Sequence, residues 1–356
     1  MARARAALGS PSMQSASPRA ELDGLADALS QVERAMREQL SSDQALVALI
    51  GDHVLGGGGK RIRPSLLLLA SELCGYTGPR RVQVAAAVEL LHTATLLHDD
   101  VVDLAQLRRG RPAANVVWGN RRAVLVGDFL YARASSMIVE DGDLDILWIF
   151  SNTIRLMAEG ELLQLERSFD PTVTEQHYYG VIDRKSAELT AAACDAGAIL
   201  GGVTRAERRR LADFGRQLGL AFQLRDDALD YSAEAAELGK RPCADVREGK
   251  VTLPLLLALK RCTAAEREQA AALLKAAGRR AAELSAEGLV DPEQVLSDDD
   301  LAPVLELVRR YRGVEDTDRR AHEHVERARA AVAPFPDGAA KRALHEAAEF
   351  AVARAH

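Results

Sequence analysis

Six aspartates of this chain fall into two groups with the same internal spacing. The groups are Asp99, Asp100 and Asp103 and, far downstream, Asp226, Asp227 and Asp230. Each group ends an apolar stretch with helical periodicity, and residues four apart on a helix share a face. Carboxylates on one face repel each other, and Mg²⁺ is typically held by one or two carboxylates together with substrate phosphates. The repeat therefore predicts two magnesium-binding faces, whereas one group alone would also suit a solvated helix end.

Basic residues occur on both sides of the first aspartate group in the sequence. A run of four glycines leads into Lys60, Arg61 and Arg63, and Arg108 and Arg109 follow the aspartates. The glycine run is not a P-loop, because Arg61 stands where Ser or Thr would follow the Lys. Arginine forks suit phosphate, and clustered cations repel unless an anion lies among them. These residues favour a phosphate ligand, with a solvated basic turn as the alternative for the glycine segment.

More cations accompany the second group and the segment before it. They are Lys185, Lys240 and Lys250, and His92 lies two turns before Asp99. This is more positive charge than one phosphate needs, and it suits two diphosphates, one bridged by metal and one held by side chains. The chemistry implied is metal-assisted departure of a diphosphate, in which fixed cations stabilise the developing charge. The apolar helices beneath would house a hydrocarbon.

Helical periodicity runs through most of the chain. The predicted helices cover about 21–54, 65–73, 82–104, 123–140, 144–165, a stretch ending at 201, 205–231, 255–260, 264–277, 301–312, 316–333 and 338–354. Aromatic residues make up only 4 %, which favours close-packed helices. The acidic run 298–300 lacks the repeated spacing and indicates a helix N-terminus. We predict one all-α domain over 21–356 after a disordered extension at 1–20, for which a transit peptide is the alternative.

Composition narrows the class of protein. The formal net charge of −6 argues against a nucleic-acid partner, whose binding surface is usually basic. The four cysteines form no Cys-x-x-Cys pair and suit free thiols in a reducing compartment, so we expect a cytoplasmic protein. No apolar run reaches the roughly 18 residues of a membrane span.

From about Gln44 to Arg354 the chain resembles the trans-isoprenyl diphosphate synthases of the polyprenyl synthetase family. The resembling motifs are Gly-Gly-Lys-Arg-Ile-Arg-Pro at 58–64, His-Asp-Asp-Val-Val-Asp at 98–103, Arg-Arg-Gly at 108–110, Gly-Asp at 127–128, Gly-Glu-Leu-Leu-Gln at 160–164, Phe-Gln at 222–223 before the second aspartate group, and Gly-Lys-Val-Thr at 249–252. The resemblance implies the isoprenoid synthase fold, an antiparallel helix bundle around a deep central cavity, in a homodimer. It also implies the reaction: an allylic diphosphate ionises, isopentenyl diphosphate attacks the cation, and a proton is lost.

The resemblance also implies roles for individual residues. Isopentenyl diphosphate would be bound by Lys60, Arg63, His92 and Arg109. Two or three Mg²⁺ ions would be held by Asp99, Asp100, Asp103, Asp226, Asp227 and Asp230. The allylic diphosphate would contact Arg108, Lys185, Ser186, Gln223, Lys240 and Lys250, and Lys185 would be catalytic together with the first five of these aspartates. Ser186 stands where the family usually has Thr, and Arg241 and Cys243 depart from the usual loop after Lys240.

Product length is predicted from the residues one to two turns before Asp99. These are Leu91, Ala94 and Thr95, and short-chain family members resemble this pattern except for an aromatic ring that stops the chain. With Ala94 the tunnel stays open, so we expect a product of about 30 to 50 carbon atoms. The alternatives are a short-chain farnesyl or geranylgeranyl diphosphate synthase, a terpene cyclase or head-to-head synthase of similar fold, and a non-catalytic partner subunit.

Overall fold

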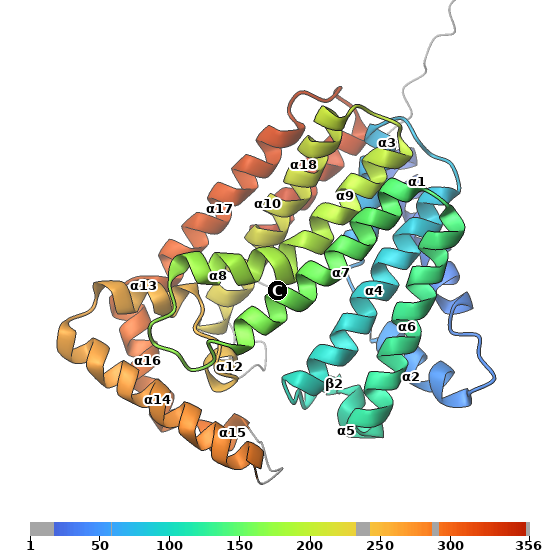
Figure 1. Cartoon of the computed structure of the whole chain (residues 1–356). Coiled ribbons are helices and arrows are strands. Elements are labelled where there is room, and N and C mark those ends of the chain that lie inside the picture. The colour runs from blue at the N-terminus through green and yellow to red at the C-terminus, as the bar shows by residue number, and fades with distance from the viewer. Residues whose placement is uncertain (1–17, 58, 233–242, 287–291, 354–356) are drawn as a thin grey trace, which may run out of the picture.

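The computed structural model of this chain describes residues 18–57, 59–232, 243–286 and 292–353, and most of them are helical (Figure 1). The first half contains α1 (Pro18–Glu38), α2 (Ala45–Gly56), α3 (Ile62–Leu73), α4 (Arg80–Val102), α5 (Ala114–Trp118), α6 (Asn120–Asp141) and α7 (Leu144–Leu165). The second half contains α8 (Glu175–Ile182), a π-helical turn (Asp183–Ala187), α9 (Glu188–Leu200), α10 (Arg205–Asp230), α12 (Ala244–Arg247), α13 (Leu253–Arg261), α14 (Ala264–Ala286), α15 (Pro292–Val295), α16 (Asp298–Arg310), α17 (Gly313–Val332) and α18 (Ala339–Val352). In the described residues the only strands are β1 (Leu107–Arg108) and β2 (Arg111–Pro112), which pair antiparallel.

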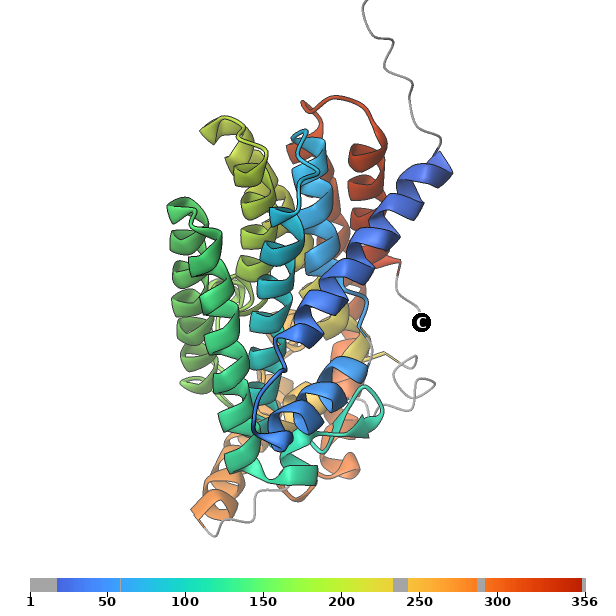
Figure 2. The same ribbon diagram turned by 90° about the vertical axis from the view of Figure 1, so that its right-hand side faces the viewer.

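The long helices lie side by side and form a bundle, which confirms the predicted all-α fold (Figures 1 and 2). Helices α4 and α10 run in the same direction, so their carboxyl ends, each carrying an aspartate group, lie at the same end of the bundle (Figure 1). Helices α13 to α16 extend to one side of this end. The topology therefore brings together two sequence segments that lie more than a hundred residues apart.

Helix α10 is the central element of the second half. Its buried residues Leu211, Phe214, Leu218 and Leu224 recur at helical spacing and pack towards α9 and α17. The helix begins at a capping box, in which Thr204 and Glu207 satisfy each other's backbone N–H groups. The capping box and the buried apolar residues stabilise α10 as one continuous helix, which ends at the second aspartate group.

Some predicted boundaries are shifted and others are confirmed. The predicted helix over 21–54 is two helices, because Ser41, Ser42 and Asp43 between α1 and α2 favour turns over helix. Helix α1 begins at Pro18, inside the stretch 1–20, whose residues 1–17 lie outside the described part of the chain. The acidic run 298–300 begins α16 with Ser297 as its cap, as predicted. No helix in the described ranges is long and apolar enough to cross a bilayer.

Candidate active site

Two adjoining pockets lie where the ends of α4 and α10 meet the π-helical turn. The larger has a volume of about 1050 Å³ and the smaller one of about 210 Å³. Both are lined by the same five polar residues, which are Asp99, Arg108, Lys185, Ser186 and Gln223. These five side chains therefore form the junction between the pockets, and all five were predicted from the sequence to be site residues.

Carboxylates of both aspartate groups face these pockets. Asp99, Asp103 and Asp227 line the smaller pocket, and Asp226 lines the larger one. Burial raises the pKa of Asp99 to about 6 and that of Asp227 to about 7, the latter despite hydrogen bonds from Tyr178 and Gln223. Charged carboxylates crowded in this way are unfavourable unless a cation balances them, so the donor set fits a hard divalent ion such as Mg²⁺.

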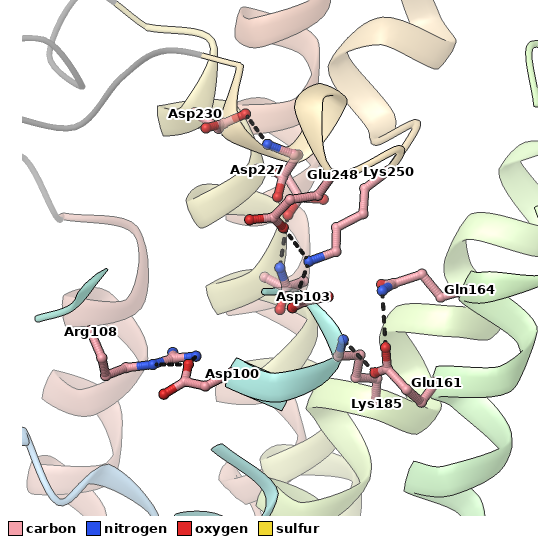
Figure 3. Close-up of polar contacts among 12 residues, drawn as sticks. Asp100, Asp103, Arg108, Glu161, Gln164, Lys185, Asp227, Asp230, Glu248 and Lys250 are labelled. Carbon is pink, nitrogen blue, oxygen red and sulfur yellow. Dashed lines mark hydrogen bonds and ion pairs between the residues drawn. The ribbon is translucent and has the colours of Figure 1, made fainter. Parts of the chain in front are cut away.

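Lysine side chains balance part of this negative charge within the protein. The Lys250 ammonium lies 3.0 Å from Asp103 and 2.6 Å from Glu248 (Figure 3). Although burial opposes it, Glu248 and Asp103 raise the pKa of Lys250. In the described ranges no three His, Cys, Asp or Glu side chains are grouped as a ready metal site. To hold a metal ion, Asp103 would have to exchange its contact with Lys250.

One aspartate of each group has a different position. Asp100 is buried and its carboxylate accepts a hydrogen bond from Arg108 Nε at 2.8 Å (Figure 3). Asp230 accepts backbone hydrogen bonds from Ala244 at 3.0 Å and Asp245 at 3.2 Å, at the start of α12. Neither aspartate lines the two pockets. Each instead fixes a neighbouring segment of the site, Asp100 through Arg108 and Asp230 through the start of α12.

A chain of hydrogen bonds connects the π-helical turn to α10 and α8. Ser186 Oγ donates to Gln223 Oε1 at 2.7 Å, and Gln223 Nε2 donates to Asp227 Oδ1 at 2.8 Å. The Tyr178 hydroxyl donates to the other oxygen of Asp227. Beside this chain, Lys185 forms an ion pair with Glu161 of α7 (Figure 3). Lys185, Ser186 and Gln223 are thus oriented by contacts with neighbouring elements.

One part of the lining of the larger pocket is cationic. It consists of Lys60, Arg63, His92 and Arg109, the residues predicted to bind isopentenyl diphosphate. Burial, aided by Arg63 and Arg109, lowers the pKa of His92 well below its usual value, so the imidazole is neutral. Two buried atoms, His92 Nδ1 and Arg63 Nε, find no hydrogen-bond partner among the described residues. Buried polar groups are normally paired, so these atoms suit a polar or anionic ligand.

Arg61, between the two predicted anion-binding residues of the glycine-rich segment, has another position. It adopts a left-handed backbone conformation, and its guanidinium lies 3.1 Å from the buried Glu89 of α4. It also lies 3.3 Å from Glu33 of α1. The charge crowding that the sequence indicated is therefore relieved in part by an internal carboxylate.

Apolar residues form much of the remaining wall of the larger pocket. Leu91, Ala94 and Thr95 line it, together with Ile154 and Met157 of α7. Leu91 and Ala94 are each 1 % exposed, so both are packed into the wall and do not project into solvent. The predicted chain-length residues thus border the cavity. The predicted diphosphate ligand Lys240 lies outside the described residues.

The match to a family model is consistent with this geometry. The model described as "Polyprenyl synthetase" matches residues 44–287, well over half of the chain. The chain belongs to the polyprenyl synthetase family. The matched range contains both aspartate groups, the cationic segment and the π-helical turn.

Relatives in the polyprenyl synthetase family match nearly the whole chain. The octaprenyl diphosphate synthase of Escherichia coli is 42 % identical over 323 residues, covering 91 % of this chain and 94 % of the relative. A polyprenyl synthase from Caulobacter crescentus, solved with calcium and isoprenyl diphosphate, is 40 % identical with a TM-score of 0.85, covering 96 % of this chain and 99 % of that one. A decaprenyl diphosphate synthase structure from Rhodobacter capsulatus is 37 % identical with a TM-score of 0.85, covering 95 % and 99 %.

Several residues of this family member were not predicted as site residues but contribute to the pockets. Asp245 and Tyr178 line the smaller one, and Glu89 and Glu161 line the larger one. Glu161 lies in the Gly-Glu-Leu-Leu-Gln motif, and Asp245 of α12 precedes Lys250 by five residues, so their sequence positions contained a signal. Glu89 and Tyr178 occur in apolar helical patterns, where the sequence alone does not distinguish a site residue from a packed one.

Proposed function

We propose that this chain is a trans-prenyltransferase that adds isopentenyl diphosphate repeatedly to an allylic diphosphate and releases a long polyprenyl diphosphate. The observation that carries the proposal is the larger pocket, whose lining combines acidic, basic and apolar residues. Two diphosphates and a growing hydrocarbon need these three environments together.

The allylic diphosphate belongs at the junction of the two pockets in this proposal. Arg108, Lys185, Ser186, Gln223 and Lys250 would hold its oxygens, and Lys240 would join them from outside the described residues. Asp99, Asp103, Asp226 and Asp227 would hold two or three Mg²⁺ ions, which act as Lewis acids on the leaving diphosphate. Asp100 and Asp230 would contribute by orienting Arg108 and α12.

Isopentenyl diphosphate belongs at the cationic part of the pocket lining. Lys60, Arg63 and Arg109 would bind its phosphates, and the neutral His92 would offer its unpaired ring nitrogen. The allylic C–O bond breaks and its electron pair leaves with the diphosphate. The double bond of isopentenyl diphosphate then attacks the carbocation, and loss of a proton restores a double bond. Lys185 and Arg108 would stabilise the charge that develops on the leaving group.

A long product suits the wall of the cavity. Ala94 is the smallest side chain among the residues that line the pocket from the last turns of α4, so no aromatic ring closes that side. We expect a product of about 30 to 50 carbon atoms, because a small side chain in a close-packed wall leaves room for the chain to extend. The relatives named octaprenyl and decaprenyl diphosphate synthases support this range.

Product analysis tests the proposal. Purified protein is incubated with Mg²⁺, labelled isopentenyl diphosphate and, in separate reactions, geranyl, farnesyl or geranylgeranyl diphosphate, and the products are sized by chromatography. We expect a long polyprenyl product that is lost in Asp99→Asn and in Asp226→Asn. Asp299→Asn, in the exposed acidic run of α16, is the matched control and should retain activity. Products that stop at farnesyl or geranylgeranyl length would indicate a short-chain synthase, and a cyclised hydrocarbon would indicate a terpene cyclase.

We also propose that residues 21–356 form one domain and that the enzyme is a homodimer. Large apolar side chains are exposed along α6 and α7, including Leu125, Val139, Leu144 and Trp148. Exposed large apolar side chains on two neighbouring helices suit a protein–protein interface. A reducing compartment such as the cytoplasm suits the four cysteines, which form no disulfide in the structure.

A further inference from the structure

The residues Asp183–Ala187 form a π-helical turn between α8 and α9. The backbone N–H of Glu188 donates to the carbonyl of Asp183, five residues earlier, and not to the residue four earlier as in an α-helix. Such turns are rare, and they often occur at functional sites. This one carries Lys185 and Ser186, and both line the two pockets. The extra residue in the turn changes the direction of these side chains by roughly one helical position, or about 100°.

Two glycines allow neighbouring helices to approach this turn closely. A Cβ atom on Gly160 of α7 would lie 2.8 Å from Arg184 Cβ and 2.9 Å from the backbone nitrogen of Lys185. A Cβ atom on Gly219 of α10 would lie 2.6 Å from the Cα of Ala187. The turn is therefore packed between two bare stretches of helix backbone. This packing restricts its sideways movement, but it does not connect its two ends.

Arg216 of α10 connects the two ends of the turn. Its Nη1 donates to Asp183 Oδ1 at 2.5 Å, and its Nη2 donates to the carboxylate of Glu188. Asp183 and Glu188 are also the two residues joined by the π-helical hydrogen bond. The planar guanidinium can reach both carboxylates at once, whereas a lysine ammonium is a single point of charge.

Arg216 also lies on the face of α10 that contacts the rest of the turn. Gly219 follows one turn later, and Gln223, which accepts the hydrogen bond of Ser186 at 2.7 Å, follows about two turns later. One face of α10 thus contacts both ends of the π-helical turn, its backbone and one of its site side chains.

We propose that Arg216 is a positioning residue that holds the π-helical turn by its two ends and so directs Lys185 and Ser186 to the junction of the two pockets. The proposal rests on the proposed function, because it assigns this junction to the allylic diphosphate. Arg216 lines neither of the two pockets and therefore acts through the turn.

Conservative substitution and direct binding measurements test the role. Arg216→Lys keeps the charge but loses the fork, and Glu188→Gln and Asp183→Asn each weaken one branch. We expect Arg216→Lys to weaken binding of farnesyl diphosphate about tenfold in calorimetry, with a matching rise in its KM, while the KM for isopentenyl diphosphate changes less than about twofold. The effects of Arg216→Lys and Glu188→Gln should be clearly non-additive.

Arg208 provides a matched control on the same helix. Two turns before Arg216, it forms a similar fork between Asp195 of α9, at 3.0 Å, and Asp145 of α7. Arg208→Lys should lower the melting temperature about as much as Arg216→Lys does, and it should leave both KM values unchanged. The proposal is overturned if Arg216→Lys costs stability without changing the ratio of the two KM values, or if Arg208→Lys changes that ratio equally.

The binding measurement separates this proposal from the proposed function. A wild-type protein that binds farnesyl diphosphate but makes no elongated product would contradict the prenyltransferase assignment, and the loss of binding in Arg216→Lys would still support the positioning role. A wild-type protein that binds none of geranyl, farnesyl and geranylgeranyl diphosphate would overturn both.

Discussion

Glu89 is a buried carboxylate among arginines, and the first prediction concerns its removal. It lies 3.1 Å from Arg61, and its side chain is 5 % exposed against 12 % for Arg61. Glu89→Gln leaves the guanidinium of Arg61 without its buried counter-charge. Breaking a buried ion pair by removing one partner costs about 3 kcal/mol or more, so we expect the free energy of unfolding in urea to fall by about that amount.

Glu33 is the control for this prediction. It is the other carboxylate partner of Arg61, but its side chain is 51 % exposed. Exposed ion pairs contribute about 0 to 1 kcal/mol, so Glu33→Gln should change the free energy of unfolding little. Inorganic pyrophosphate should also raise the melting temperature of Glu89→Gln more than that of wild type, since it supplies the missing negative charge. Equal losses in the two variants would contradict the assignment of Glu89 as the internal counter-charge.

Ala94 is the residue at which product length should be most sensitive. It is 1 % exposed and lines the larger pocket, so a phenyl ring there must enter the space of the hydrocarbon. We expect Ala94→Phe to shorten the products, measured by chromatography of the labelled polyprenols. Leu91 lies about one turn earlier, and a turn rises 5.4 Å, roughly one extended prenyl unit. Leu91→Phe should therefore give products about one unit longer than those of Ala94→Phe, and an unchanged product distribution in both would exclude this wall as the limit.

The roles of single residues were only partly predictable. The repeated spacing was sufficient to select Asp99, Asp103, Asp226 and Asp227, which all line the pockets. It did not separate them from Asp100, which pairs with Arg108, because this partner comes from strand β1, whose position depends on tertiary structure. Spacing on one helix defines which side chains share a face, but it does not show what the other elements place opposite that face.

At the scale of elements, helical periodicity predicted nearly all the long helices. The π-helical turn was not predictable, because its extra residue is accommodated by Gly160 and Gly219 on two other helices and by Arg216. The sequence 183–187 alone is compatible with an ordinary α-helix. Tertiary contacts therefore determine the backbone geometry of the turn that contains the site residues Lys185 and Ser186.

A buried histidine at the contact between α10 and α17 should make the stability of the protein fall in mild acid. His324 of α17 is buried, and its Nδ1 lies 2.7 Å from Gln217 Oε1 of α10. Burial, with Arg327 nearby, lowers the pKa of His324 to about 4, below the 6.5 of an unfolded histidine. As the pH falls, the unfolded state binds the proton before the folded state does. The contribution of neutral His324 to the free energy of unfolding is therefore complete above pH 6.5 and is lost as the pH falls towards 4. We expect a loss of about 1 to 2 kcal/mol after allowing for solvent screening, measured by urea unfolding across that range.

The variant His324→Asn isolates this contribution. Other groups titrate in the same range, so the informative quantity is the difference in unfolding free energy between wild type and variant at each pH. That difference should be largest near pH 7 and shrink towards pH 4. A difference that does not change with pH would show that His324 has the same pKa in both states.

At the scale of the whole molecule, the all-α bundle could be predicted and the shape of its cavity could not. Chain order and helix lengths are consistent with a bundle in which α4 and α10 point the same way (Figure 1). The volume of the larger pocket depends on which small and large side chains from α4, α7 and α9 face each other, including Ala94, Ala158 and Thr190. These pairings are three-dimensional, so the motif order indicated the chemistry but not the space available for the product.

The apolar surface of α6 and α7 leads to the prediction for the assembly. These helices lie at one edge of the bundle, and Leu144 and Trp148, which share a face of α7, are 77 % and 66 % exposed (Figure 2). A second copy of the chain would bury both, and a buried tryptophan at an interface commonly contributes 2 kcal/mol or more. We expect a dimer in light scattering after size-exclusion chromatography. Trp148→Glu should raise the dissociation constant of the dimer by about 30-fold or more.

Leu49 of α2 serves as the control, because it is 59 % exposed and lies outside these two helices. Leu49→Glu should leave the dimer intact, while Trp148→Glu gives monomer at low micromolar concentration with an unchanged helical circular dichroism spectrum. Equal effects of both substitutions would indicate general destabilisation. A wild-type monomer would rule out the interface. A dimer that Trp148→Glu does not affect would show that the subunits meet at another surface, and the apolar face of α6 and α7 would then lack its proposed partner.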